Sequence, residues 1–65
     1  MTDTQAIKEL ASTRCRCGAV KRAYDSFCLA CYRRLPQEER RRLYTQVENG
    51  YAEIYENAVK LLGLP

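Results

Sequence analysis

The chain has no histidine and no tryptophan among its 65 residues, and it has one phenylalanine, two prolines and three glycines. Without histidine there is no Cys–His or Ser–His pair and no imidazole to move protons, so we do not expect an enzyme. Its mean hydropathy is -0.51. It also lacks a run of about 20 apolar residues, so no membrane-spanning segment is expected.

The short length makes the residues 1–65 a single small domain. Chains below about 70–80 residues rarely stabilise themselves through one apolar core and usually need disulfides, a metal or a partner. The N-terminus has no basic stretch followed by an apolar run, so no secretory signal is predicted. We therefore expect the protein in reducing cytoplasm, where structural disulfides are rare and clustered cysteines indicate a metal.

Four cysteines form two close pairs, with ten residues between the pairs: Cys15, Cys17, Cys28 and Cys31. Two tight turns that each present two thiolates supply a tetrahedral site, so we predict one structural Zn²⁺ on these four residues. Gly18, directly after the first pair, permits a positive φ that turns backbone N–H groups toward the sulfur atoms. A rubredoxin-like iron site and a disulfide or redox use are the alternatives.

Three segments are expected along the chain. Residues 1–12 should form an N-terminal helix from about Thr4 to Ala11, because Thr2 and Gln5 have the spacing of a capping box. Residues 13–34 should form the zinc-binding head, made of turns with at most a short β-hairpin. We expect the tip of that hairpin near residues 21–25.

Residues 35–65 are predicted to form a two-helix tail. Pro36 suits the first turn of a helix, and the stretch from Glu38 to Glu48 contains only good or neutral helix formers. Asn49-Gly50 should end this helix, and the apolar pattern after it recurs with helical spacing until Gly63. The predicted fold class is a small, metal-stapled, α-rich domain. It consists of an N-terminal helix, a Cys₄ zinc ribbon or zinc-finger-type knuckle, and a C-terminal helical hairpin.

The formal charge of +3 is unevenly distributed along the chain. Residues 13–34 carry +5 and residues 35–42 carry +1, whereas residues 1–12 carry -1 and residues 43–65 carry -2. Arginine suits phosphate through its planar fork, and exposed tyrosine can stack on an unpaired base. The candidate nucleic-acid-binding residues are Arg14, Arg16, Lys21, Arg22, Tyr24, Tyr32, Arg33, Arg34, Arg40, Arg41 and Arg42. Alternatively, these cations offset the formal charge of a zinc-tetrathiolate centre or lie on ordinary solvated faces.

The last helix carries an apolar stripe that admits two interpretations. The first is that this stripe completes a small core together with Ile7, Leu10, Phe27 and Leu35. The second is that part of it is exposed and binds a host protein or a second copy, because tyrosine is common in binding surfaces. The candidate interface residues in that second interpretation are Tyr51, Ile54, Tyr55 and Val59.

The arrangement of motifs resembles the small, mostly uncharacterised zinc-ribbon proteins of bacteriophage and prophage genomes. The resemblance covers about residues 15–62. It rests on the two cysteine pairs, Ser26-Phe27 before the second pair, Leu35-Pro36, Arg42-Leu43-Tyr44 and Gly50-Tyr51. It implies a short zinc-binding head followed by a helical tail, acting inside a bacterial host cell. It implies little about activity.

Together these observations favour a non-catalytic zinc-binding module that contacts DNA or RNA through an arginine-rich face, in phage or prophage regulation. The rival hypothesis is a protein-binding adaptor or inhibitor of a host bacterial machine, with purely structural zinc. A third and weaker hypothesis is a small electron-transfer protein that uses iron. The sequence alone does not determine whether DNA or RNA is bound, which nucleotide sequence is preferred, which host protein is the target, or what the oligomeric state is.

Overall fold

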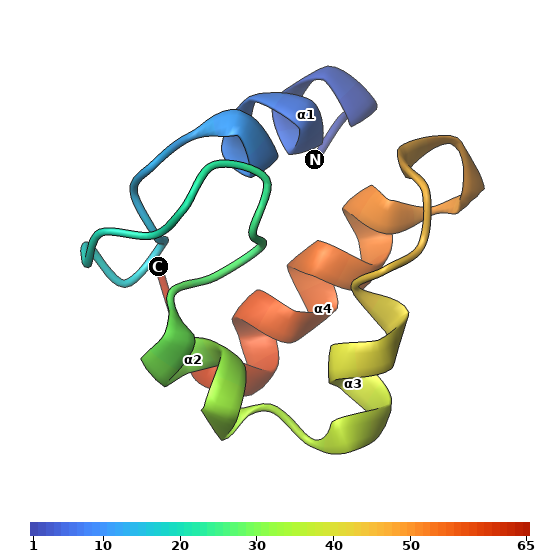
Figure 1. Ribbon diagram of the computed structural model, residues 1–65. Coiled ribbons are helices and arrows are strands. Elements are labelled where there is room, and N and C mark those ends of the chain that lie inside the picture. Colours follow the sequence, from blue (N-terminus) through green and yellow to red (C-terminus); the bar gives the residue numbers. More distant parts are fainter.

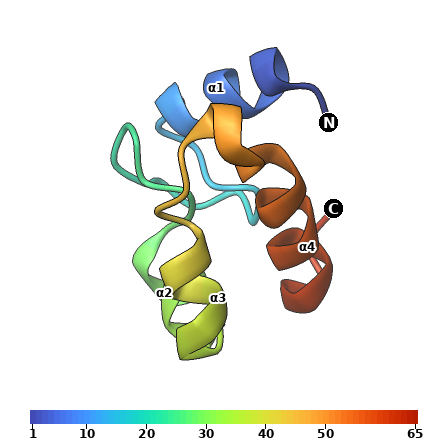
Figure 2. The same cartoon turned by 90° about the vertical axis from the view of Figure 1, so that its right-hand side faces the viewer.

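The computed structural model describes all 65 residues and contains four α-helices and one 3₁₀ helix. The α-helices are α1 (Asp3–Ala11), α2 (Leu29–Arg34), α3 (Gln37–Arg42) and α4 (Tyr51–Leu62), and the 3₁₀ helix η1 spans Val47–Asn49. α4 crosses the centre of the view in Figure 1 and lies along one side of the molecule in Figure 2, with α1 across the end at which α4 begins and α2 and α3 toward the other end. α4 contacts both α1 and α3.

The predicted N-terminal helix is confirmed together with its cap. The Gln5 backbone N–H donates to Thr2 Oγ1 at 3.2 Å, and the Thr2 backbone N–H donates to Gln5 Oε1 at 2.9 Å. Asp3 lies in the first turn, where its negative charge suits the positive end of the helix dipole. α1 packs through Ala6, which is fully buried, whereas Ile7 is exposed.

The predicted β-hairpin near residues 21–25 is wrong. No strand forms, and the one antiparallel bridge joins Arg14 to Val20. That bridge encloses the first cysteine pair, because the Cys15 N–H donates to Ala19 O at 2.8 Å and the Lys21 N–H donates to Thr13 O at 2.8 Å. The turn therefore surrounds the first pair of candidate metal ligands instead of projecting beyond it, and the topology of a β-ribbon is not seen.

The second cysteine pair lies on a helix that the sequence did not lead us to expect. α2 begins directly after Cys28 and contains good helix formers, among them Leu29 and Ala30. It ends at Leu35, whose backbone is extended at φ -77° and ψ 144°. The residue before a proline avoids the helical region, so Pro36 separates α2 from α3.

The first tail helix is shorter than predicted, because α3 ends at Arg42 and not at Glu48. Beyond it the Tyr44 N–H donates to Arg41 O at 3.2 Å and the Thr45 N–H donates to Arg42 O at 3.0 Å. These bonds to the third preceding residue tighten the chain into a turn that buries Leu43 and exposes Tyr44. α4 begins after Gly50 and ends before Gly63, both at positive φ, as predicted.

The apolar stripe of α4 forms the centre of the core. Tyr51, Tyr55 and Val59 are buried and Ile54 is partly buried, so the tentative protein interface built from these four residues is wrong for the folded chain. The Phe27 ring stacks on Tyr55, with centroids 5.0 Å apart and an interplanar angle of 7°. The core interpretation of the stripe is confirmed for Phe27 and Leu35, which are buried, and for Leu10, which is partly buried. It is wrong for Ile7, which is 52% exposed.

Candidate metal centre and basic surface

The four cysteine sulfur atoms lie within 4.8 Å of one another, and Cys17 Sγ and Cys28 Sγ are 3.6 Å apart. Thiolates bound tetrahedrally to one ion at about 2.3 Å are separated by about 3.8 Å, so the cluster has the dimensions of a mononuclear site. Cys15, Cys28 and Cys31 are buried, and Cys17 is exposed. The four cysteines could hold a metal ion, as their spacing in the sequence predicts.

A tight turn positions the first pair. The Gly18 N–H donates to Cys15 O at 2.9 Å, and Gly18 adopts φ +97°, which L-residues rarely occupy. This geometry directs the Ala19 backbone N–H at the Cys17 sulfur. That hydrogen bond, with further ones from Cys15 and the other thiols, lowers the pKa of Cys17 to about 7. The positive φ predicted for Gly18 is thus confirmed.

The start of helix α2 positions the second cysteine pair. Cys28 precedes the first residue of α2 and Cys31 lies in its first turn, three residues on, so both side chains are on one side of the helix. Burial raises the pKa of the Cys15 and Cys31 thiols. A cation bound among the sulfur atoms opposes this effect, because it favours the thiolate form that ligation requires.

Three of the candidate phosphate-binding arginines donate hydrogen bonds to backbone carbonyls within the fold. Arg16 donates to Pro65 O from Nε at 3.0 Å and from Nη2 at 2.6 Å. Arg34 donates to Leu62 O at 3.3 Å, and Arg40 donates to Leu35 O at 3.0 Å. The first of these bonds holds the C-terminal residue against the loop of the first cysteine pair (Figure 1). Arg34 and Arg40 satisfy carbonyls at the ends of α4 and α2, which the helices leave free.

Lys21 was predicted on the basic face, and this is wrong because its side chain is only 5% exposed. Its ammonium group donates to Ser12 O and, at 3.3 Å, to Leu10 O, at the C-terminal end of α1. Burial lowers its pKa, while Asp25 and Cys15 oppose that shift. Lys21 therefore joins α1 to the cysteine segment and is not available to a phosphate.

Replacing Lys21 by methionine should destabilise the metal-loaded protein by about 1–3 kcal/mol, because two partly buried carbonyls lose a charged donor. Arg22→Met is the matched control: Arg22 is exposed and reaches only Asp25, at 3.4 Å, so its loss should change stability by less than about 0.5 kcal/mol. Urea unfolding measures both variants. Equal stabilities would show that the Lys21 contacts contribute nothing to the fold.

The remaining arginines divide into paired and unpaired groups. Arg42 reaches Glu39 at 3.6 Å, one helical turn away, and in this pair the arginine is exposed whereas the Glu39 side chain is mostly buried. Arg14, Arg33 and Arg41 are exposed and their side chains have no hydrogen-bond or ion-pair partner. The predicted single basic face therefore reduces to these three free guanidinium groups, together with the exposed pair partners Arg22 and Arg42.

The two candidate stacking residues differ in exposure. Tyr24 is exposed, whereas Tyr32 is half-buried beneath the guanidinium of Arg40, which lies 5.7 Å from its ring centroid. The Tyr32 hydroxyl is 3.1 Å from the hydroxyl of Tyr44, a residue that we did not predict as functional. The Tyr32–Tyr44 hydrogen bond raises the pKa of Tyr32.

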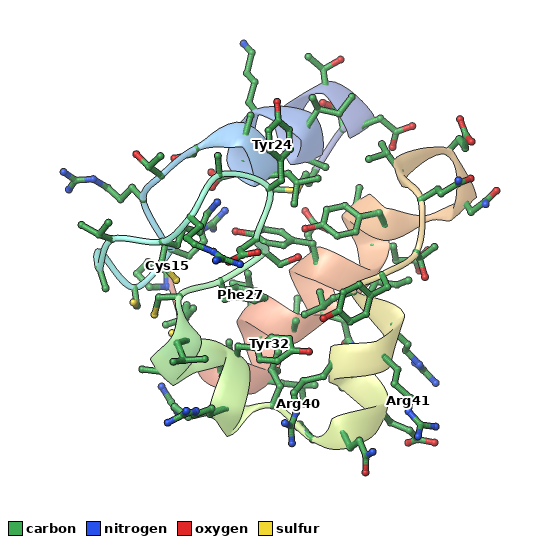
Figure 3. The ribbon with its side chains drawn as sticks, viewed as in Figure 1. Cys15, Tyr24, Phe27, Tyr32, Arg40 and Arg41 are labelled. Atoms are coloured by element: carbon green, nitrogen blue, oxygen red, sulfur yellow. The ribbon has the colours of Figure 1, made fainter.

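Sequence reasoning also missed a groove of about 660 Å³, here called the tyrosine groove. Its walls come from the residues 20–29 segment, from α2 and from the turn after α3. In Figure 3, Tyr24, Phe27 and Tyr32 follow one another down the middle of the view. Among its lining residues, the exposed ones with large apolar side chains that were not predicted to bind a ligand are Val20, Leu29 and Tyr44. They carry no common sequence signal, because each belongs to a different segment.

Comparisons of the chain with protein-family models, with curated proteins and with solved structures give no match. None of the helices has the length and apolarity that crossing a membrane requires.

Proposed function

We propose that the four cysteines bind one Zn²⁺ whose role is structural. An all-sulfur ligand set suits zinc, and four protein ligands leave no open position for water or substrate. The support in this chain is the compact cluster itself, in which one tight turn and one helix start each present two sulfur atoms. Iron is the alternative metal for four thiolates, and the visible spectrum separates the two because ferric thiolate is coloured and Zn²⁺ is not.

We further propose that the zinc-stapled domain is a non-catalytic module that contacts nucleic acid. The observation that supports this function best is that Arg14, Arg33 and Arg41 are exposed and unpaired. Each lies on a segment that adjoins the cysteine cluster or continues from it. A guanidinium that no carboxylate satisfies is available to a phosphate, which it can bind through two parallel hydrogen bonds. The resemblance to phage and prophage proteins suggests a regulatory role in the cytoplasm of a bacterial host.

Replacing Arg14, Arg33 and Arg41 together by glutamine should weaken the salt dependence of binding. Each phosphate contact to a single strand contributes about 0.7 to the slope of log affinity against log salt, so the slope should decrease by about 2. Fluorescence anisotropy of the zinc-loaded chain at several salt concentrations measures this slope. The variant Lys8→Gln, on the exposed side of α1, serves as a control that should leave the slope unchanged. An unchanged slope in the triple variant would show that residues other than these three arginines contact the phosphates.

A protein-binding adaptor is the second candidate, and exposed aliphatic side chains favour it. Val20 and Leu29 project into solvent at the tyrosine groove, where a partner's apolar side chains would cover them. The two candidates separate in a pull-down from a bacterial host lysate with and without nuclease. Capture that nuclease abolishes supports nucleic acid, whereas a defined protein retained after nuclease and high salt supports the adaptor.

A further inference from the structure

The tyrosine groove collects most of the large apolar side chains that the fold leaves exposed. Six such residues are exposed in the whole chain, and four of them line this groove: Val20 (86% exposed), Tyr24 (73%), Leu29 (63%) and Tyr44 (79%). The other two, Ile7 and Leu61, lie on α1 and α4 and do not line it. Exposed apolar groups concentrated in one concave site indicate a binding surface.

Each of the three unpaired arginines adjoins one exposed residue of the groove. Arg14 is the bridge partner of Val20, and side chains of paired residues stand on the same side of an antiparallel bridge. Arg33 follows Leu29 by one turn on the same side of α2. Arg41 precedes Tyr44 within one tight turn, in which the Tyr44 N–H donates to Arg41 O. The groove therefore has an apolar and aromatic interior, and the three arginines, which do not line it themselves, lie on the segments that adjoin its walls.

Several contacts hold the aromatic walls in place. The Tyr32 and Tyr44 hydroxyls are hydrogen-bonded, and Phe27 at the base stacks on buried Tyr55. Tyr24 adopts φ +69°, a left-handed conformation that a bulky side chain rarely occupies. Glycine or asparagine would fit that backbone better, yet the chain places a mostly exposed aromatic ring there.

We infer that the tyrosine groove binds a short segment of single-stranded nucleic acid. Unpaired bases stack on Tyr24 and Tyr44, and the flanking phosphates are bound by Arg14, Arg33 and Arg41. This inference rests on the proposed nucleic-acid function and specifies its substrate class. A single strand matches the groove because each of its units carries both a negative charge and a flat, largely apolar face. A duplex hides those faces within its stacked pairs.

Charge complementarity favours this occupant over a peptide. Asp25 is the only carboxylate that lines the groove, and Arg22 neutralises it. A peptide that matched the same surface would need apolar side chains and several carboxylates at suitable intervals. Arginine and tyrosine side by side form the stacking and electrostatic surface that single-strand binding uses.

The test measures fluorescence anisotropy of labelled ten-nucleotide oligo-dT, oligo-U and a mixed-sequence duplex with the zinc-loaded full chain. Single strands should bind at least 10-fold tighter than the duplex. Tyr24→Gly and Tyr44→Ala should each weaken single-strand binding by about 10-fold, because one stacked base is lost. Tyr24→Gly relieves an unfavourable backbone conformation, so its melting temperature should equal or exceed that of the parent. Ile7→Ala and Leu61→Ala remove exposed apolar groups outside the groove and should leave binding unchanged.

The possible failures are distinguishable. Equal binding of duplex and single strand, without loss in the two tyrosine variants, would overturn the groove assignment and leave the proposed nucleic-acid function intact. Absence of salt-sensitive binding to all three probes would overturn both. A defined protein partner lost only in the groove variants would also overturn the assignment, because it would show that the groove serves a peptide.

Discussion

Chelating the metal under reducing conditions is expected to unfold the protein. A structural zinc site contributes an apparent 10–16 kcal/mol or so, whereas a domain of this length has a total unfolding free energy of about 3–10 kcal/mol. α1, α2 and α3 have 9, 6 and 6 residues, and helices of that length are not stable in water without tertiary contacts. Far-UV circular dichroism should show most of the helical signal lost on chelation and restored by Zn²⁺.

Cysteine variants make the same test without a chelator. Cys17→Ser and Cys31→Ser should each abolish stoichiometric metal binding and the cooperative thermal transition. Ala30→Ser is the matched control, because Ala30 is exposed between two ligands and contributes no sulfur. A chelated protein that kept its helical signal and its melting temperature would show that the apolar core alone maintains the fold.

Tyr55→Ala should destabilise the metal-loaded protein by about 3–5 kcal/mol. The Tyr55 ring is 1% exposed and stacks on Phe27, and Tyr51 lies at a centroid distance of 6.0 Å from it. Removing the ring leaves a cavity at the point where α4 meets the cysteine-bearing segment. In a domain of marginal stability this loss should leave much of the protein unfolded at 25 °C.

Tyr55→Phe is the matched control, and its effect should have the opposite sign. The Tyr55 hydroxyl is buried without a hydrogen-bond partner, and burial raises its pKa. Phenylalanine keeps the stack and removes the unsatisfied group, so stability should rise by about 1 kcal/mol. Urea unfolding compares both variants with the parent. A stable Tyr55→Ala protein with impaired partner binding would instead support the rejected interface interpretation of α4.

Local sequence signals predicted the two ends of the chain well. The capping box of α1 involves residues three positions apart, and the apolar stripe of α4 begins and ends at glycines with positive φ. Both features depend on neighbours along the chain, which the sequence displays directly. The two cysteine pairs could also be predicted from the sequence, because the two cysteines of each pair are neighbours along the chain and lie within one turn.

The errors concern features that depend on contacts between distant segments. Lys21 is adjacent to Arg22 in the sequence, yet only Lys21 lies against the carbonyls that end α1. No local pattern distinguishes the two residues. Likewise, Arg16 and Arg34 are indistinguishable from free cations until the C-terminal residues fold back against them.

Helix lengths between the cysteine cluster and α4 were mispredicted for a related reason. The stretch after Arg42 has adequate helix formers, but the chain turns there and buries Leu43, while neighbouring Tyr44 remains exposed at the groove. Tertiary packing thus overrides a weak propensity. The tyrosine groove could not be predicted, because its walls combine segments that only the fold brings together.

Native mass spectrometry of the reduced, purified protein measures directly whether zinc is bound to the four cysteines. We expect one Zn²⁺ per chain, bound with all four cysteines as thiolates, and complete loss of the ion from Cys17→Ser and Cys31→Ser but not from Ala30→Ser. A folded, metal-free chain, or a chain whose cysteines are joined in disulfides, would contradict it.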